Sequence, residues 1–194
     1  MPIGINGNGT ITGVTVGGLP DGIVDTDMLA ADSVTAPKIG SKTFTSYAII
    51  ADQKASGSQG GAFTAGAWRT RDLNTELVDP DGIVSISSNQ FTLQAGSYLI
   101  EAQAPSFAVL RHIIKLYQTS GTPADIAFGT AVYNNSVYND GVSVLKARVT
   151  ISTATTYEIR HRCQTTNSGA TAMGVSSNFG NTELYTVVQI FKEA

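Results

Sequence analysis

The sequence predicts an all-β protein, built as an antiparallel sandwich or barrel of short strands. Charged residues make up only 14% of the 194 residues, against a usual share of about 25%. Gly occurs 20 times, and Ser, Thr and Asn supply much of the polar surface. From residue 43 onward, short segments of apolar and polar alternation recur, with turn signals roughly every 10–15 residues. No segment reads as a convincing helix.

The first expected strand, at 44–52 (FTSYAIIAD), is rich in β-branched and aromatic residues and precedes a Gly- and Ser-rich loop at 54–61. A second, at 67–73 (AWRTRDL), alternates. DPDG at 79–82 is a turn signal, because Pro presets φ and Gly accepts a positive φ. The carboxylates of Asp79 and Asp81 are therefore expected to serve this turn.

Further alternating or β-branched segments follow with turn residues between them, and 97–104 alternates most cleanly, just before Pro105. With the two above and 107–118, they amount to about nine or ten strands. The expected segments are 83–87, 91–94, 97–104, 126–133, 142–152, 155–166 and 182–192.

The longest apolar stretch, 107–118 (FAVLRHIIKLYQ), is also long enough for a helix. Arg111 and Lys115 lie four residues apart, as on one helical face. The β-rich surroundings and the preceding Pro105 favour a strand instead. Strand alternation then separates two faces, one with Leu110, His112, Ile114 and Leu116 and the other with Arg111, Ile113, Lys115 and Tyr117.

Residues 1–42 differ in composition from the expected head domain, residues 43–194. Residues 1–22 are Gly-rich and too poor in large apolar residues to bury a core. Residues 21–40 form a ten-residue repeat, DGIVDTDMLA over ADSVTAPKIG. Its spacing fits neither helix nor strand. Either several copies form an extended stalk around matched apolar positions, or the segment is an unstructured leader. The matched positions are Val24, Leu29, Val34 and Ile39.

Composition excludes several classes of protein. The net charge of −3 and the pI of about 5.2 argue against nucleic-acid binding. The single cysteine, Cys163, excludes an intrachain disulfide and a cysteine-based zinc cluster. The start, MPIGINGNGT, does not resemble a signal peptide, and no stretch approaches the ~20 apolar residues of a membrane span. We expect synthesis in a cytoplasm, no cleaved leader and no membrane insertion.

Two histidines and the cysteine are the possible soft metal ligands. Alternation places His161 and Cys163 on one face of their strand, and His112 on the corresponding face of 107–118. These three side chains either form a buried metal site or are packed and hydrogen-bonded. HxH and HExxH spacings are absent, which favours packing. We expect no metal and no cofactor.

A positive patch is expected on the opposite face of the same strands. It would contain Arg111, Lys115, Arg160 and Arg162 if the strands are neighbours. Such a patch either holds an anionic sugar or a lipopolysaccharide phosphate, or solvates an outer face together with Glu158.

Catalytic motifs are absent from the sequence. There is no GxSxG elbow, phosphate-binding GxxxxGK[ST] loop or GxGxxG fingerprint. Asp25 and Asp27 lie in the repeat, where no core would raise a carboxylate pKa. The sequence therefore predicts a protein that is not an enzyme.

The last expected strand is apolar on both faces. Leu184, Thr186, Val188 and Ile190 alternate with Tyr185, Val187, Gln189 and Phe191. Such a strand is typically covered on both sides, often by another subunit. We therefore take Tyr185, Val187 and Phe191 as candidates for a subunit interface.

Residues 44–194 resemble a family of bacteriophage virion proteins. The resemblance is carried by ASGSQGGAFTAGAWRTRDLNTE, DPDGIVSISSNQFTLQAGSYLIEAQAP, YEIRHRCQTT and LYTVVQIFKE. Most specific is the run Trp68, Arg69, Arg71, Leu73 and Asn74. The resemblance to this family implies a C1q/TNF-like jelly-roll head that forms a homotrimer. The segment GGLPDGIVDTDMLAADSVTAPKI is similar to segments of phage tail fibres that precede the distal domain.

This resemblance implies a structural virion protein, assembled in the host cytoplasm. We expect a short trimeric tail fibre or spike whose head adheres to a host surface glycan or protein, while residues 1–42 bind other virion proteins. The alternative is a capsid decoration or head-fibre protein without receptor recognition. Aromatic side chains favour sugar binding, and the expected loops offer two candidates, Tyr133 and Tyr138.

Overall fold

The computed structural model describes residues 4–5, 11–12, 43–133 and 139–194. The chain divides into two compact units, Met1–Lys42 and Thr43–Ala194. In the first unit, β1 (Gly4–Ile5) pairs antiparallel with β2 (Ile11–Thr12). The sequence candidates Val24, Leu29, Val34, Ile39 and Tyr138 lie outside the described residues.

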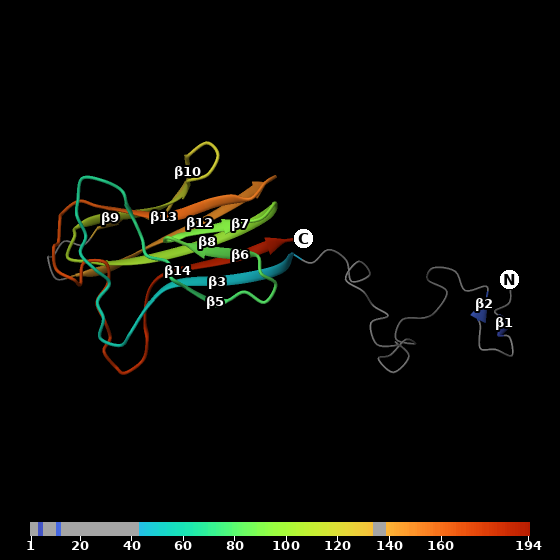
Figure 1. Cartoon of the computed structure of the whole chain (residues 1–194), viewed down its shortest axis with the longest axis horizontal. Coiled ribbons are helices and arrows are strands. Elements are labelled where there is room, and N and C mark those ends of the chain that lie inside the picture. The colour runs from blue at the N-terminus through green and yellow to red at the C-terminus, as the bar shows by residue number, and fades with distance from the viewer. Residues whose placement is uncertain (1–3, 6–10, 13–42, 134–138) are drawn as a thin grey trace. The chain divides into compact units, whose positions relative to one another are not determined.

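The second unit is a sandwich of two antiparallel sheets (Figure 1). The five-stranded sheet has the order β12-β8-β14-β3-β5. These strands are β3 (Phe44–Lys54), β5 (Thr75–Val78), β8 (Gly96–Phe107), β12 (Asp140–Ile151) and β14 (Glu183–Glu193). The predicted all-β sandwich is confirmed.

The other sheet has seven strands. Its main path is β10-β9-β13-β7-β6, while β11 also pairs with β9 and β4 with β13. The strands are β4 (Arg69–Thr70), β6 (Val84–Ser87), β7 (Gln90–Leu93), β9 (Arg111–Gln118), β10 (Ala124–Phe128), β11 (Val132–Tyr133) and β13 (Thr155–Cys163). No helix in the described ranges is long and apolar enough to cross a membrane.

The ambiguous stretch 107–118 contains a strand, as predicted, but with different bounds. β8 runs through Pro105 to Phe107, and β9 begins only at Arg111. Between them, Ala108 and Leu110 have φ of 57° and 60°. A residue in this left-handed region breaks the strand geometry. Leu110 therefore lies outside β9, and the prediction that placed it on the His112 face is wrong.

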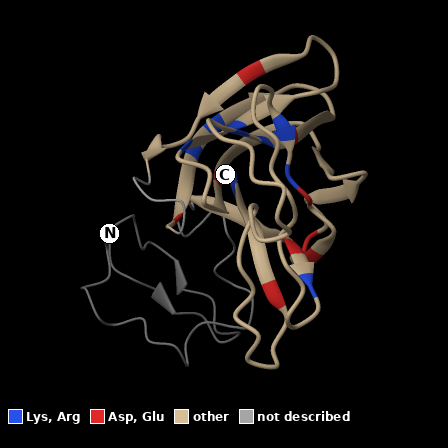
Figure 2. Cartoon of the chain, turned by 90° about the vertical axis from the view of Figure 1, so that its left-hand side faces the viewer, with Lys and Arg blue, Asp and Glu red and all other residues tan. Residues whose placement is uncertain are grey.

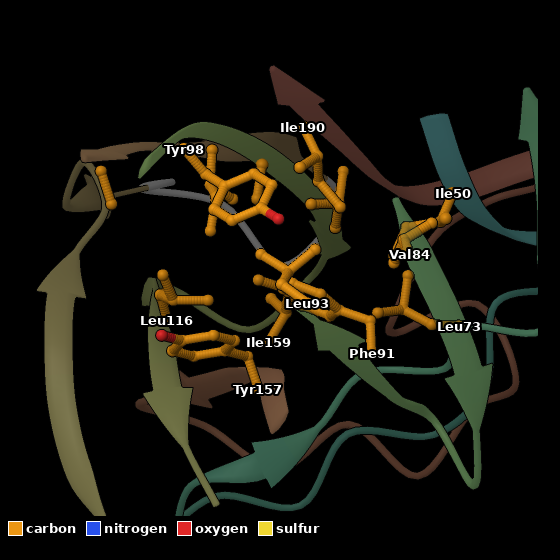
Figure 3. Packing of buried hydrophobic residues seen from close by; sticks show 14 of the residues in the cluster. Ile50, Leu73, Val84, Phe91, Leu93, Tyr98, Leu116, Tyr157, Ile159 and Ile190 are labelled. Atoms are coloured by element: carbon orange, nitrogen blue, oxygen red, sulfur yellow. The ribbon is translucent and has the colours of Figure 1, made fainter. Parts of the chain in front are cut away.

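The apolar core lies between the two sheets. Figure 3 shows Tyr98 and Ile190 of the five-stranded sheet facing Leu116, Tyr157 and Ile159 of the seven-stranded sheet. All five are at most 1% exposed. Since strand side chains alternate, each strand directs its other residues outward.

The DPDG segment forms the predicted turn. The Asp79 carboxylate accepts hydrogen bonds from the backbone N–H groups of Ile83 and Val84, both at 2.9 Å. Gly82 has a φ of 62°, a conformation that glycine adopts without strain. Asp79 is therefore a structural residue of this turn.

The segment between β10 and β11 joins the sheets at one edge. Thr130 donates its backbone N–H to the carbonyl of Val144 in β12 at 2.7 Å. The buried Ser143 hydroxyl donates to the carbonyl of Thr130 at 2.7 Å and accepts from the N–H of Ile114 at 3.1 Å. The predicted strand 126–133 is thus divided into β10 and β11 around a crossing between sheets.

Different strand ends lie at the two ends of the sandwich. At one end Phe44, the start of β3, pairs with Glu193, near the end of β14. At the opposite end β9 begins and β13 ends, with His112 paired to Cys163 (Figure 1). We call this opposite end the distal end of the head.

Candidate functional site

A hollow in the described part of the surface lies at the distal end. It is an open cavity of about 410 Å³ on β9, β11, β13 and their flanking residues. Alternation and register place the side chains of Arg111, Ile113, Tyr133, Arg162 and Gln164 on the outer face of the sheet. We call it the Arg111–Arg162 cavity. Figure 2, which looks at this end, shows several of the Lys and Arg positions close together.

Neither arginine of the cavity has an acidic partner among the described residues. Arg111 Nη1 donates to Gln164 Oε1 at 2.9 Å, and its Cζ lies 4.7 Å from the centroid of the Tyr133 ring. This is the geometry of a cation–π contact. Arg162 is exposed, and its side chain makes no hydrogen bond, ion pair or ring contact within the described residues. Arg111 keeps further N–H donors beyond its bond to Gln164, and neither guanidinium group meets a carboxylate of the described residues, so both can donate to an anion.

The other two basic residues of the predicted patch are neutralised by neighbours. The Lys115 ammonium pairs with Asp125 and lies 4.3 Å from the centroid of the Trp68 ring. The Arg160 guanidinium pairs with Glu158. Because β9 and β13 are paired, the predicted gathering of basic residues is present. Only its distal half has basic side chains without an acidic partner among the described residues. Lys115 and Glu158 are each 4% exposed, so the paired half does not solvate the outer face as the second interpretation expected. Whether the distal half holds an anion stays a prediction.

Beneath the cavity lies a buried histidine pair. His112 Nδ1 and His161 Nε2 are 2.9 Å apart, so one ring donates a hydrogen bond to the other. Burial, followed by the positive charge of Arg71, lowers the pKa of His112 to about 4. Burial, then Arg71 and His112, also lowers the pKa of His161 well below its ordinary value. Both rings are therefore neutral at pH 7.

Arg71 is the charged residue beside this pair, and it is 1% exposed. Its Nε donates to Thr186 Oγ1 at 2.8 Å, and its Nη2 donates to the carbonyl of Met173 at 2.8 Å. Burial lowers the pKa of Arg71 to about 10, so the group stays cationic at pH 7. A fixed cation at this position disfavours a divalent metal ion at the histidines.

Cys163, the third possible metal ligand, forms a hydrogen bond with the backbone. Its thiol donates to the carbonyl of Thr165 at 3.4 Å, and burial raises its pKa to about 11. The described residues contain no group of three or more His, Cys, Asp or Glu side chains arranged to hold a metal ion. The geometry fits packed side chains, in which each histidine ring makes one hydrogen bond, to the other ring. His112 Nε2 and His161 Nδ1 have no hydrogen-bond partner among the described residues.

The sequence candidates for a subunit interface do not share one face. Val187 and Phe191 lie half-buried on the outer face of the five-stranded sheet, and the Phe191 ring lies 5.3 Å from that of Phe44. A β-bulge between Leu184 and Val187 interrupts the alternation. Tyr185 is therefore only 4% exposed and donates its hydroxyl to the carbonyl of Ser58 at 2.5 Å. The prediction that Tyr185 shares the face of Val187 is wrong.

Comparisons with known proteins identify the fold. No protein-family model and no curated protein matches the sequence. Among solved structures, murine APRIL at pH 5.0 has 9% sequence identity and a TM-score of 0.54, over 76% of this chain and 98% of that chain. The head is a C1q/TNF-like jelly roll. At this level of identity the likeness shows the fold alone.

Two further structures are similar to the jelly roll at lower TM-scores. The globular domain of the zebrafish complement 1qA protein has 20% identity and a TM-score of 0.49, over 75% of this chain and 95% of that chain. Eiger TNF from S. frugiperda has 9% identity and a TM-score of 0.49, over 79% of this chain and 94% of that chain. The resemblance of the sequence to phage virion proteins stays a prediction.

Some features of the site were not foreseen from the sequence. Local sequence does not predict that Arg71 is buried, because arginine side chains are almost never fully buried in proteins. The histidine pair had a signal, since alternation put both rings on inward faces. What the sequence lacked was the register, which pairs His112 with Cys163 and His161 with Ile114.

Proposed function

We propose that this chain is a structural protein of a bacteriophage virion, a short trimeric tail fibre or spike whose jelly-roll head adheres to the host surface. The observation that carries the proposal is the position of the Arg111–Arg162 cavity. The head unit begins at Thr43, next to Phe44 at one end of the sandwich, and the cavity lies at the distal end. In this proposal the first end serves attachment and the distal end binds the host.

A homotrimer is proposed from the outer face of the five-stranded sheet. Exposed apolar side chains gather there, including Tyr47 (46% exposed), Val142 (47%) and Val144 (37%). Val187 and Phe191 lie on the same face, because their register partners are Gln103, Leu99 and Tyr47. Exposed apolar side chains gathered on one face mark an interaction surface. Domains with the C1q/TNF fold typically form homotrimers, and a second copy is the occupant that we propose for this face.

Polar side chains lie on this face among the apolar ones. Arg148 of β12 forms a bidentate contact with the Glu193 carboxylate at 2.6–3.1 Å. Lys146 of β12 pairs with Glu101 of β8 at 2.8 Å. Protein interfaces typically combine apolar contacts with direct hydrogen bonds between polar groups.

Adhesion would depend on several weak contacts. Three copies per trimer and several trimers per particle raise the total affinity far above that of one site, without any new contact. Domains with this fold are typically non-enzymatic binding domains, and we propose no catalytic step. Residues 1–42 would bind other virion proteins, and assembly would occur in the host cytoplasm.

The proposal is tested by adhesion of the full-length chain to host cells. Fluorescently labelled protein should bind the cells at micromolar concentration and should delay adsorption of the phage in competition. Cells resistant to the phage through loss of a surface glycan are the matched control. If the chain neither binds host cells nor delays adsorption, adhesion is excluded, and the alternative of a capsid decoration or head-fibre protein is favoured.

A further inference from the structure

The Arg111–Arg162 cavity combines free positive charge with apolar and aromatic surface. The net charge of the whole chain is −3, yet two guanidinium groups of this cavity have no carboxylate partner among the described residues. Charge complementarity therefore points to an anionic ligand. An arginine fork binds a carboxylate or a phosphate through two parallel hydrogen bonds.

The rest of the cavity suits a ring with an apolar face. Its volume of about 410 Å³ falls within the roughly 300–1,000 Å³ of small-ligand sites. Tyr133 is 58% exposed, and Arg111 lies over its ring. Ile113, Ala131 and Val132 supply further apolar lining, while the Gln164 side chain supplies an amide for hydroxyl groups.

We infer that the Arg111–Arg162 cavity binds an acidic saccharide, that is, a sugar ring bearing a carboxylate or a phosphate. The C–H face of the ring would pack on Tyr133 and Ile113, and the anionic group would accept hydrogen bonds from Arg111 and Arg162. This inference rests on the proposed adhesive function, because it names the class of ligand that the head recognises.

Titration calorimetry of the full-length chain with three defined saccharides tests the inference. Trigalacturonate carries carboxylates, galactose 6-phosphate carries a phosphate, and galactotriose is neutral. At least one of the two acidic compounds should bind, and galactotriose should not. Binding should weaken as NaCl is raised from about 0.05 to 0.5 M, because salt screens exposed charges. Which acidic compound binds then tells whether the charged group is a carboxylate or a phosphate.

Substitutions locate the binding. Arg162→Gln removes a guanidinium with no hydrogen bond, ion pair or ring contact to other described residues, so the variant should fold and bind about tenfold more weakly or worse. Arg111→Gln should have a similar effect, and Tyr133→Ala should weaken binding about three- to tenfold. Lys192→Gln is the matched control. It removes one positive charge near the opposite end, beside Glu193, and should leave the affinity within about twofold.

Several results would overturn the inference. These are no binding of either acidic saccharide, equal binding of galactotriose, or wild-type affinity in Arg162→Gln. Cell adhesion separates this failure from failure of the proposed function. If the double variant Arg111→Gln/Arg162→Gln still adheres to host cells as well as the wild type, the inference fails and adhesion stands. If the wild type binds acidic saccharides but not host cells, adhesion fails and the cavity assignment stands.

Discussion

Acid should destabilise the jelly roll through the buried pair His112 and His161. Both histidines have lowered pKa values in the folded protein, about 4 for His112 against an ordinary value of 6.5. The unfolded chain therefore binds more protons between these values. The contribution of the neutral pair to the free energy of unfolding is fully present above pH 6.5 and is lost as the pH falls from 6.5 toward 4.

The size of the effect follows from the linkage of protonation to unfolding. Each histidine lowers the free energy of unfolding by up to about 1.4 kcal/mol per pH unit below 6.5. Two histidines would give about 2.7 kcal/mol between pH 7.5 and 5.5. His112 lines the open Arg111–Arg162 cavity, where solvent screens part of the charge, so we expect a loss of about 2 kcal/mol. The melting temperature should fall by about 4–8 °C for a domain of this size.

Other titrating groups contribute outside this window or in the opposite direction. Backbone hydrogen bonds from Ser177 and Asn178 lower the pKa of Glu183 to about 2, so protonation of Glu183 removes stability only below pH 4.5. Burial raises the pKa of Asp52 from 3.8, and its protonation on acidification stabilises the fold. Above pH 5.5 the histidine pair should dominate.

The assay is urea unfolding at a fixed protein concentration, at pH 7.5, 6.5 and 5.5. His112→Asn removes one titrating group, so this variant should lose about half of the wild-type pH dependence, whatever its stability at pH 7.5. Equal wild-type stability at pH 7.5 and 5.5 would refute the account of the pair. So would an unchanged pH dependence in His112→Asn.

Three further predictions concern the interface, the thiol and the crossing between sheets. Val187→Asp places a charge on the proposed interface and should reduce the mass measured by light scattering to that of one chain; Val175→Asp, on an exposed loop residue, should leave a trimer. The Cys163 thiol should react with Ellman's reagent only after unfolding, because it is 5% exposed and has a pKa of about 11; rapid reaction in the native protein would contradict this. Gly129→Ala would place a Cβ 2.8 Å from the carbonyl oxygen of Val144 and should lower the free energy of unfolding in urea by about 1–3 kcal/mol. A decrease below about 0.5 kcal/mol would show that the backbone between the sheets shifts to accommodate the methyl group.

Strand periodicity predicted the faces of the site correctly. Alternation placed Arg111 and Arg162 outside and His112, His161 and Cys163 inside, as the structure has them. This succeeds because successive side chains of a strand point to opposite sides, whatever the strand pairs with. The alternation within one strand is therefore enough to predict which of its side chains share a face.

Contacts between distant segments were not readable in this way. The bulge at Leu184 lies next to Glu183, whose carboxylate accepts hydrogen bonds from loop residues Ser177 and Asn178. Tyr185 is held inward by the carbonyl of Ser58, more than 100 residues earlier in the chain. The bulge and the inward position of Tyr185 both depend on where a distant loop contacts the sheet. The sequence around these residues does not indicate that position.

The division of the basic patch has the same origin. Lys115 is paired because β10 brings Asp125 beside it, whereas the strand next to Arg111 brings Tyr133. The sequence placed four cations on one face but did not indicate which would meet a carboxylate. Free charge in the distal cavity is thus a property of strand order and register.

Immunogold labelling of intact phage particles with antibody against residues 43–194 tests the central proposal most directly. The account predicts label at the tail tip or on the tail fibres, with the heads exposed to the medium. Label spread over the capsid would contradict it and would favour a decoration protein that does not recognise the host.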